Sequence, residues 1–354
     1  MTKKVKIGKI TIGGGNPVAV QSMTNTKTAD IKSTVSQIKR LQEAGCEIIR
    51  CSVPDIESAL AIKKIKENIK IPLVADIHYD YRLAIESLKN GADKIRINPG
   101  NIGNQERLRD VIKIAKSKDA AIRIGVNSGS LKSNINYKLK IKSKNATANQ
   151  MVASLMEYVE FFENENFSNL VISLKASDVL TTIEAYRLFS KLRDYPLHIG
   201  ITEAGTELGG IIKSSIGIGI LLSEGLGDTI RVSLTADPEM EVYVAYRILN
   251  TLGLRRRGID IISCPTCART EIDVIKIAHK VEEMTKNIAL PLKVAVMGCS
   301  VNGPGEASHA DIGITGSKSI GVIFKRGKII KKVKKKDLLK EFMKELNIII
   351  KENS

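Results

Sequence analysis

Three of the five cysteines lie in two motifs near the C-terminus. Cys264 and Cys267 form a CxxC motif, and Cys299 opens the segment CSVNGPGE, which ends at Glu306. Each motif directly follows a short apolar run, so we expect both to leave the ends of strands and to meet in space. Grouped thiolates are ligands of zinc and of iron–sulfur clusters. The spacing therefore predicts a metal site of one of these two kinds.

The fourth ligand distinguishes the two kinds of metal site. Structural zinc takes a fourth Cys or His, and His279 and His309 are nearby, although neither has the paired spacing of zinc fingers. The glycine-rich residues 302–305 would let backbone N–H groups approach the sulfides of a bulky cluster. A cluster held by three cysteines keeps one replaceable ligand, for which Glu306 is the candidate. Spacing alone leaves zinc open, and it leaves open whether Glu306 is only a surface carboxylate.

A second group of chemically capable residues lies at the ends of predicted strands. Its cations are Arg50, Arg96, Arg123, Lys175 and Arg231, and the other members are His78, Asn127 and Glu203. Two like charges about 7 Å apart repel by roughly 2 kcal/mol at an effective dielectric near 20, so several together favour a bound anion. Arginine forks suit phosphate geometry, and the set predicts a site for a multiply charged ligand such as a diphosphate.

Two other interpretations of these residues remain open. Asp76 and Glu203 would neutralise some of the cations if these form structural ion pairs. Lys175 would form a Schiff base in an aldolase-type barrel. Glu203 is also a candidate general acid, because it lies near the cations without sharing their charge.

The elements that position these residues alternate between strands and helices. Apolar runs of strand length are followed by segments with apolar residues at three- and four-residue spacing. The predicted strands cover residues 18–21, 47–51, 73–77, 94–97, 121–126, 169–174, 197–201 and 229–233. They are apolar on both faces, as expected for buried parallel strands. Eight such units predict an α/β fold, a TIM barrel with its active site at the carboxyl ends of the strands.

The remaining segments complete a two-domain organisation. Residues 1–255 are expected to form the barrel, with a hairpin in the first seventeen residues that turns at Gly13–Gly15 and closes the barrel floor. The polar loop 127–148 is a candidate lid. Residues 259–354 are expected to form a smaller α+β domain, with a helix at 270–286 between the two cysteine motifs and a helix at the C-terminus.

Composition narrows the class of protein. The net charge of +17 favours anionic partners, although the lysine-rich residues 325–340 are also typical of a solvated helix face. Aromatic residues make up 4% and tryptophan is absent, so stacking platforms for nucleic acid are scarce and no nucleic-acid partner is expected. No apolar run is long enough to span a membrane, and the N-terminus has no signal-peptide pattern, so we expect a cytoplasmic protein. Cys46 and Cys51 are predicted to be small core residues.

Long motifs along the chain resemble those of a known enzyme family. They include VQSMTNT, VADIHYD, KIRINPGNIG, IRIGVNSGSL, VISLKASD, HIGITEAG, LLSEGLGDTIRVSLTADP, ISCPTCART and GCSVNGPGEA. The chain resembles the 4-hydroxy-3-methylbut-2-enyl diphosphate synthases, iron–sulfur enzymes of the non-mevalonate isoprenoid pathway, in their compact bacterial form. The resemblance implies a TIM barrel followed by a reductase-like domain with a 4Fe-4S cluster.

The resemblance also implies an activity and roles for single residues. The activity is the reductive ring opening and dehydration of 2-C-methyl-D-erythritol 2,4-cyclodiphosphate by two electrons that pass through the cluster, with flavodoxin or ferredoxin as the donor. The implied cluster ligands are Cys264, Cys267, Cys299 and Glu306. The implied substrate-binding residues are Arg50, His78, Arg96, Arg123, Asn127, Lys175 and Arg231.

The remaining implications concern proton transfer and assembly. Glu203 is the implied proton donor, and Glu306 is expected to give up its iron to a substrate oxygen. The implied assembly is a homodimer in which the cluster domain of one subunit covers the barrel of the other. The alternative from another class is a basic RNA-associated protein whose zinc site is only structural.

Overall fold

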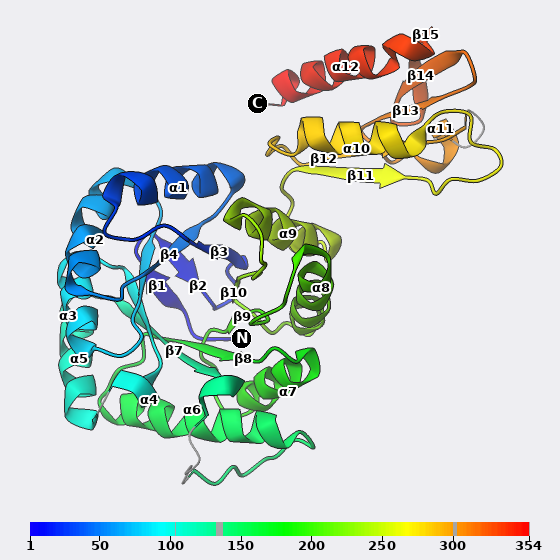
Figure 1. The fold of residues 1–354 in the computed structure, drawn as a ribbon. Coiled ribbons are helices and arrows are strands. Elements are labelled where there is room, and N and C mark those ends of the chain that lie inside the picture. The colour runs from blue at the N-terminus through cyan, green and yellow to red at the C-terminus, as the bar shows by residue number, and fades with distance from the viewer. Residues whose placement is uncertain (103, 132–136, 300–302, 354) are drawn as a thin grey trace. The chain divides into compact units, whose positions relative to one another are not determined.

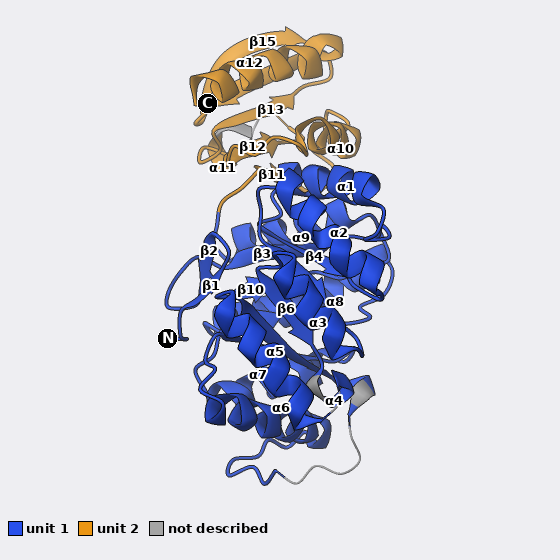
Figure 2. Ribbon diagram, turned by 90° about the vertical axis from the view of Figure 1, so that its left-hand side faces the viewer, with its two compact units in different colours: residues 1–255 blue, residues 256–354 orange. Residues whose placement is uncertain are grey.

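The computed structural model describes residues 1–102, 104–131, 137–299 and 303–353. The chain divides into two compact units, residues 1–255 and residues 256–354 (Figure 2). Each unit has a hydrophobic core of its own, so each is described separately.

The first unit is a closed barrel of parallel strands, as Figure 1 shows in a view along the barrel. The barrel strands are β3 (Ala19–Met23), β4 (Ile48–Ser52), β5 (Leu73–Asp76), β6 (Lys94–Ile97), β7 (Ala121–Asn127), β8 (Leu170–Lys175), β9 (His198–Ile199) and β10 (Thr229–Ile230). Their order in the sheet is β8-β7-β6-β5-β4-β3-β10-β9, and a parallel bridge between Ile172 and Leu197 joins its two ends. The predicted TIM barrel is confirmed.

The last two barrel strands are shorter than predicted. We expected strands at 197–201 and 229–233, but the ladder between β9 and β10 ends at Ile199 and Ile230. At the next position, Gly200 has a φ of +154°, and a Cβ on it would lie 2.3 Å from the carbonyl oxygen of Arg231. A φ of this value lies outside the range of a regular strand, and the position has no room for a side chain. The chain therefore leaves the strand before the residues that were predicted to extend it.

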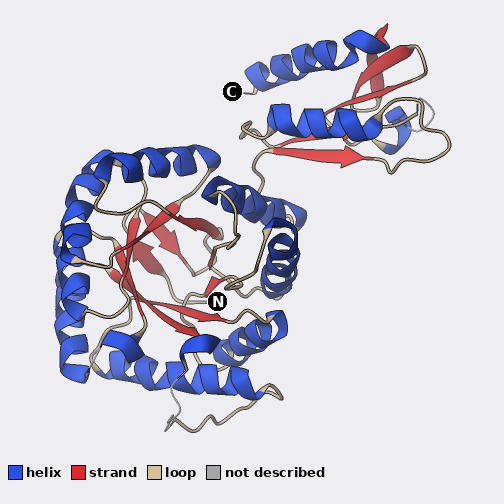
Figure 3. Cartoon of the chain, viewed as in Figure 1, coloured by secondary structure: helices blue, strands red, loops and turns tan. Residues whose placement is uncertain are grey.

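Helices surround the strands (Figure 3). They are α1 (Ile31–Ala44), α2 (Ile56–Asn68), α3 (Tyr81–Lys89), α4 (Pro99–Ile102), α5 (Gln105–Ser117), the short 3₁₀ turn η1 (Ser128–Ser130), α6 (Ala146–Asn164), α7 (Val179–Ser190), α8 (Glu207–Ser223) and α9 (Pro238–Thr251). Six of them begin at an N-cap whose side chain accepts a backbone N–H of the first turn, namely Asp30, Asp55, Asp80, Asn104, Asn145 and Asp178. These caps end the loops after β3 to β8 and so help to fix the positions of the strand-end residues. No helix of the described residues is long and apolar enough to cross a membrane.

An N-terminal hairpin closes the barrel floor, as predicted, but its turn lies elsewhere. β1 (Val5–Ile7) pairs with β2 (Ile10–Ile12), so the turn is at Gly8 and not at the three glycines 13–15. Gly8 has a φ of +55°, the left-handed conformation that a two-residue hairpin turn requires. The hairpin packs on apolar residues at the amino ends of the barrel strands, among them Ile48 and Val74. The barrel is therefore closed at this end, and ligands must enter at the other.

The seam between β8 and β9 depends on one buried tyrosine. The Tyr186 hydroxyl donates to the carbonyl oxygen of His198 at 2.6 Å and accepts the N–H of Leu174 at 3.0 Å. We expect Tyr186→Phe to lower the free energy of unfolding by about 1–3 kcal/mol, because it leaves both backbone groups buried without a partner. Urea denaturation measures this, with Tyr79→Phe as the control, since Tyr79 is 74% exposed. Equal stability of the two variants would contradict the role of this hydroxyl.

The second unit is a five-stranded sheet with two helices on one face. Its elements are β11 (Ile259–Ser263), α10 (Val274–Thr285), β12 (Leu292–Val296), α11 (Gly303–Glu306), β13 (Ile312–Gly316), β14 (Ile320–Lys325), β15 (Lys328–Lys334), the 3₁₀ turn η2 (Lys335–Asp337) and α12 (Leu338–Glu352). β11, β12 and β13 are parallel, and β14 and β15 continue the sheet antiparallel. Apolar residues of α10 and α12 join those of the strands in one core. α10 is shorter than the helix predicted at 270–286, because Asp273 caps it.

Candidate active site

The interior of the barrel is polar where many TIM barrels carry branched aliphatic residues. Residues alternate along each strand, so that Ile49 and Cys51 belong to the core beneath the helices whereas Arg50 faces the interior. Hydrogen bonds and ion pairs connect several members of the inward set to one another or to Glu241 of α9. The inward set comprises Gln21, Arg50, Asp76, Lys94, Arg96, Arg123, Ser173, Lys175, His198, Thr229 and Arg231. An interior of this kind is a binding site and not a hydrophobic core.

Asp76 is the anionic centre of this interior. Its carboxylate is fully buried and lies 2.7 Å from Nη2 of Arg50, 3.4 Å from Nη1 of Arg96 and 3.4 Å from Nε2 of His78. Burial alone would raise the pKa of Asp76, but the charges of Arg50 and Arg96 outweigh it and lower the pKa to about 2. Arg50 and Arg96 therefore form ion pairs with Asp76. For these two cations, the alternative that Asp76 neutralises them in structural ion pairs is confirmed.

Replacing Asp76 should reveal its coupling to pH. Its folded-state pKa of about 2 lies below the ordinary 3.8, so its stabilisation is complete above pH 4 and is lost as the pH falls toward 2. We expect Asp76→Asn to lower the free energy of unfolding by about 3–5 kcal/mol at pH 7, because two buried guanidinium groups lose their partner, and by less near pH 2. Urea denaturation at both pH values measures this, with the exposed Asp194→Asn as control. If Asp76→Asn lowered the free energy of unfolding by the same amount at both pH values, the link between stability and the pKa of Asp76 would be contradicted.

Arg231 is paired with a carboxylate that sequence reasoning missed. Glu241 on α9 lies 3.4 Å from Nη2 of Arg231 and also accepts the backbone N–H of Leu234 at 3.0 Å. Glu241 is buried and accepts the Ser22 hydroxyl at 3.5 Å. It stands in the first turn of a helix, where an acidic residue is common for reasons of helix stability, so no sequence signal marked it as a site residue.

Lys175 is held by a buried histidine that was also missed. Its Nζ lies 3.3 Å from Nε2 of His198, and Nδ1 of His198 lies 2.8 Å from Oγ1 of Thr229. Burial first, and then Arg123 and other cations, lower the pKa of Lys175. Burial and Lys175 likewise lower the pKa of His198, so the neutral ring accepts from the lysine through Nε2. Gly200 leaves room for this contact, since a Cβ there would lie 2.8 Å from Nζ of Lys175.

Arg123 and Lys94 are two further basic residues of the interior, and neither forms an ion pair with a described carboxylate. Arg123 is 2% exposed, and its Nε and Nη1 have no hydrogen-bond partner among the described residues. Lys94 is fully buried, and among the described residues its Nζ donates to Oε1 of Gln21 at 3.4 Å. Burial first, and then Arg123 and Arg50, lower the pKa of Lys94. Lys94 was not predicted as a site residue, because it begins its strand, although it shares the face of Arg96 two residues later.

The interior therefore carries more positive than negative charge. In the described part of the chain four arginines, Arg50, Arg96, Arg123 and Arg231, face two carboxylates that pair with them, Asp76 and Glu241. Lys94 and Lys175 add further N–H donors, and burial lowers the pKa of both lysines. Nε of Arg50 and Nε of Arg96 also lack hydrogen-bond partners within the described ranges of the chain. Buried donors without partners are rare and call for a ligand or water. The chemistry of these donors favours an anion with several oxygens.

Three further predicted residues stand at the mouth of the barrel. The side chain of His78 is 44% exposed, and Asn127 ends β7 in register with Lys175 of β8. Glu203 is exposed and has a φ of +51°, which is rare for a residue other than glycine. Glu203 makes no ion pair with another described residue. The structure therefore gathers the predicted cations inside the barrel and leaves Glu203 in solvent.

Part of the candidate lid lies outside the described residues, namely 132–136. The following segment is anchored to the barrel helices: Tyr137 donates to Glu160 on α6, Leu139 is buried, and Asn145 donates to Thr181 on α7. The function of the loop as a lid stays a prediction.

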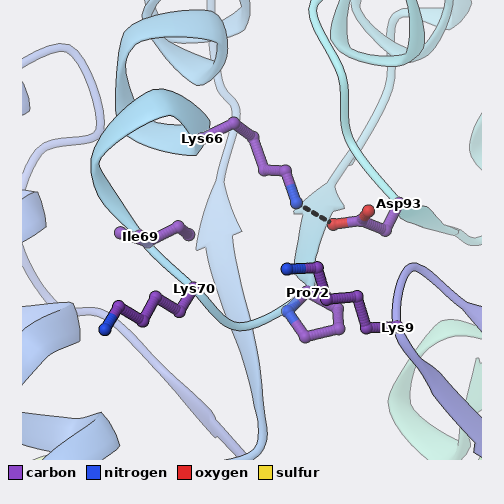
Figure 4. A pocket seen from close by; sticks show the side chains of 6 residues that line it. All are labelled: Lys9, Lys66, Ile69, Lys70, Pro72 and Asp93. Atoms are coloured by element: carbon purple, nitrogen blue, oxygen red, sulfur yellow. Dashed lines mark hydrogen bonds and ion pairs between the residues drawn. The ribbon is translucent and has the colours of Figure 1, made fainter.

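The hollow in Figure 4 lies on the opposite, amino-terminal side of the barrel. Its volume is about 210 Å³, and its lining includes Lys9 of the hairpin turn, Lys66, Lys70 and Asp93. Asp93 accepts Lys66 at 2.5 Å and the backbone N–H of Leu73 at 2.7 Å. Asp93 thus neutralises part of this surface and holds an amino strand end, so the hollow does not belong to the candidate active site.

The cysteine motifs follow neighbouring strands, as predicted. Cys264 comes directly after β11, and its Sγ accepts the backbone N–H of Gly298, just after β12, at 3.1 Å. A Cβ on Gly298 would lie 3.3 Å from this sulfur, so glycine permits the approach. Cys299 is held by Thr315, whose hydroxyl donates to its carbonyl oxygen at 2.7 Å.

The other two predicted ligands are exposed. The pKa of Cys267 is lowered by the backbone N–H of Arg269 first, and then by its side chain, which favours the thiolate. Glu306 ends α11, and residues 300–302 between it and Cys299 lie outside the described residues. No three of the described Cys, His, Asp and Glu side chains come together closely enough to hold a metal ion. Cys46 and Cys51 are buried, and burial raises their pKa values to about 12 and about 11, in agreement with the predicted core role.

Solved structures show the same barrel architecture at low sequence identity. A dihydropteroate synthase from Stenotrophomonas maltophilia matches with a TM-score of 0.52 and 10% identity, over 71% of this chain and 98% of that one. A type I 3-dehydroquinate dehydratase from Clostridium difficile matches with a TM-score of 0.50 and 20% identity, over 71% and 98%. At such identities the likeness shows the fold alone.

Sequence comparisons are far more specific. A protein of Caldanaerobacter subterraneus is 58% identical over 99% of this chain and 98% of its own length, and one of Clostridium acetobutylicum is 56% identical over 98% of each. Both are named 4-hydroxy-3-methylbut-2-en-1-yl diphosphate synthase (flavodoxin). The family model of the GcpE TIM-barrel domain matches residues 2–246, and that of the GcpE protein C-terminal domain matches residues 260–348. With both units matched, the chain belongs to the GcpE family.

Proposed function

We propose that this protein reduces 2-C-methyl-D-erythritol 2,4-cyclodiphosphate to 4-hydroxy-3-methylbut-2-enyl diphosphate. The observation that carries the proposal is the excess of buried cations with unsatisfied N–H groups in the barrel interior. A cyclic diphosphate supplies the negative charge and the oxygens that these groups need. The names of the relatives from Caldanaerobacter and Clostridium support the same reaction.

The barrel residues bind and orient the substrate. Arg123, Arg50 and Arg96 offer N–H groups that have no partner within the described residues, so they are assigned to the diphosphate oxygens. Lys175 and Arg231 extend the positive surface toward the strand ends, with His78 and Asn127 at the mouth. Because Asp76 and Glu241 already hold Arg50, Arg96 and Arg231 in place, the site is preorganised and little side-chain order is lost on binding.

The cysteine loops fit a 4Fe-4S cluster in the chemistry of their donors. Three thiols, one of them with a lowered pKa and one that accepts a backbone N–H, match the ligands and the sulfur hydrogen bonds that clusters use. We assign Cys264, Cys267, Cys299 and Glu306 as its ligands. When bound, such a cluster supplies single electrons at low potential.

The reaction consumes two electrons and two protons, breaks the carbon–oxygen bond that closes the ring and releases one hydroxyl as water. Glu203 is assigned as the donor of the proton to the departing hydroxyl. Its exposed position in a left-handed turn at the mouth leaves it open to solvent for reprotonation. Its carboxyl proton passes to the hydroxyl oxygen, and water returns a proton afterwards.

The proposal also includes an electron donor and an assembly. Flavodoxin is the proposed donor, as in the names of the relatives, and the proposed assembly is a homodimer. Sedimentation at the concentration of the activity assay tests the assembly. If the sedimenting species had the mass of a single chain, the proposed homodimer would be wrong.

An anaerobic assay with the cyclodiphosphate and dithionite tests the reaction. We expect a brown protein with iron and sulfide near four per chain, as a 4Fe-4S cluster requires, and formation of the linear diphosphate. The alternative, a basic RNA-associated protein with structural zinc, gains no support from the comparisons. It predicts a colourless zinc protein with strongly salt-dependent RNA binding. A cluster without turnover of this substrate would favour another barrel enzyme.

A further inference from the structure

The strands of the second unit bring a group of basic residues to the end of the sheet that carries the cysteines. β11, β12 and β13 are parallel, so their carboxyl ends and the cysteine loops share one end of the sheet. β14 begins at this end, because its residue Gly321 pairs with Gly316 at the end of β13. β15 ends there, because Lys334 pairs with Ile320 at the start of β14. The start of β14 and the end of β15 therefore lie at the cysteine end.

Five basic residues and one isoleucine at this end form an exposed surface, which we call the cysteine-end patch. It consists of Arg269, Lys318, Ile320, Lys334, Lys335 and Lys336, all of them exposed. A chain of hydrogen bonds links it to the cysteines. Nζ of Lys335 donates to the carbonyl oxygen of Glu271 at 3.1 Å, the N–H of Glu271 donates to Gly298 at 2.9 Å, and Gly298 donates to Sγ of Cys264 at 3.1 Å.

The charge of this patch is of one sign. Between Asp311 and Asp337 the chain has nine Lys and Arg residues and no acidic residue. In the described part of the chain Lys318, Lys334 and Lys336 make no ion pair, whereas Lys331 on the same strand pairs with Glu341 and Glu345 of α12. An ordinary solvated surface mixes both signs. A field of one sign is typical of a surface that steers a charged partner.

An apolar side chain stands within the patch. Ile320 is 47% exposed, and it pairs in the sheet with Lys334. An apolar contact surrounded by charges is the usual arrangement of a protein docking site, where the charges guide the encounter and the apolar group gains contact area. A free anion would not require the isoleucine, so a protein partner is favoured.

We propose that the cysteine-end patch docks an acidic, flavin-carrying electron-transfer protein of the flavodoxin type. The inference rests on the proposed function, which requires an electron donor, and on the donor that the names of the relatives print. An acidic carrier complements the patch in charge, and docking there places its flavin close to the loops of Cys264 and Cys267. Short distance and a loose, salt-sensitive contact suit a carrier that must bind and leave in each cycle.

Protection of the sheet edge explains only some of these lysines. Lysines on an edge strand prevent pairing with other chains, and Lys328 and Lys332 along β15 serve this purpose. Arg269, Lys318 and Lys336 lie outside the strand, where edge protection does not need them. Exposed basic residues at the start of β15, away from the cysteine end, therefore supply a matched control.

The test compares two double variants with the same change of net charge. Lys334→Glu with Lys336→Glu alters the patch, and Arg326→Glu with Lys328→Glu makes the same change of charge at the other end of β15. Lys335 is left unchanged, because it holds the Glu271 segment. The anaerobically purified proteins are titrated with oxidised flavodoxin by calorimetry at low and at high ionic strength.

We expect the patch variant to raise the Kd for flavodoxin at least about tenfold at low ionic strength, and the control variant to change it by less than about threefold. Lys318→Glu, in a separate loop, should weaken binding in the same direction. Turnover with dithionite should be unchanged in all three. Equal weakening by both double variants, or no binding to the unsubstituted protein, would overturn the docking site. Failure of the proposed function would instead appear as absent turnover with dithionite, whatever the Kd.

Discussion

Arg123→Gln should lower kcat/KM for the cyclodiphosphate by roughly ten- to a hundredfold, the equivalent of about 1.5–3 kcal/mol for one charge-assisted contact. Arg123 is buried, and two of its nitrogens have no partner within the described residues. Its N–H groups therefore remain available for the substrate. Steady-state kinetics with dithionite as the donor measures the loss without involving the carrier protein.

The same substitution should not destabilise the free protein. Burial, Arg50 and Arg96 all lower the pKa of Arg123, so its charge is unfavourable before an anion binds. We expect Arg123→Gln to keep or raise the melting temperature while activity falls, a combination that marks a residue retained for function. The exposed Arg109→Gln is the matched control and should leave the kinetics unchanged. Unaltered kcat/KM in Arg123→Gln would remove Arg123 from the substrate site.

Cys264→Ser should abolish most of the cluster, because it removes one of three proposed thiolate ligands and the sulfur that accepts Gly298. Iron and sulfide analysis of anaerobically purified protein measures the loss, together with the brown absorbance. Cys51→Ala is the matched control, since it also removes one of the five thiols but lies buried in the barrel. The control should keep its iron content.

Glu306 tests the fourth ligand separately. We expect Glu306→Gln to keep the folded protein and to lose part of the iron, because three thiolates still hold the rest of the cluster. Glu283→Gln on α10 is an exposed control. Iron content equal to that of the unsubstituted protein in both Cys264→Ser and Glu306→Gln would contradict the ligand assignment.

The fold could be predicted from the sequence because its signal is periodic. Apolar strands and amphipathic helices alternate along the whole first unit, and the N-cap residues at the loop ends reinforce the pattern. Short strands were less predictable. β9 ends at Ile199, where Gly200 takes a φ of +154° and a side chain would collide with Arg231, a residue far away in sequence. The hairpin turn was misplaced for a local reason, since Gly8 and the glycines 13–15 all carry turn signals.

The site could be predicted where a residue stands at a strand end. Asp76 and the arginines were found by this rule. Glu241 was missed because its partner Arg231 is on another element, and His198 because a lone histidine in a strand carries no signal of its contact with Lys175. For the cysteines, strand ends predicted that Cys264 and the segment before Cys299 adjoin, but spacing does not determine the closure of a ligand shell.

The central claim is that the buried positive charge of the barrel binds a diphosphate. Calorimetric titration of the cyclodiphosphate into the anaerobically purified protein, without any reductant, tests it most directly because no electron transfer is needed. We predict one binding event per chain, weakened at least about tenfold in Arg123→Gln, and no binding of the unphosphorylated methylerythritol. Absent binding of the cyclodiphosphate, or equal affinity in Arg123→Gln, would contradict the claim.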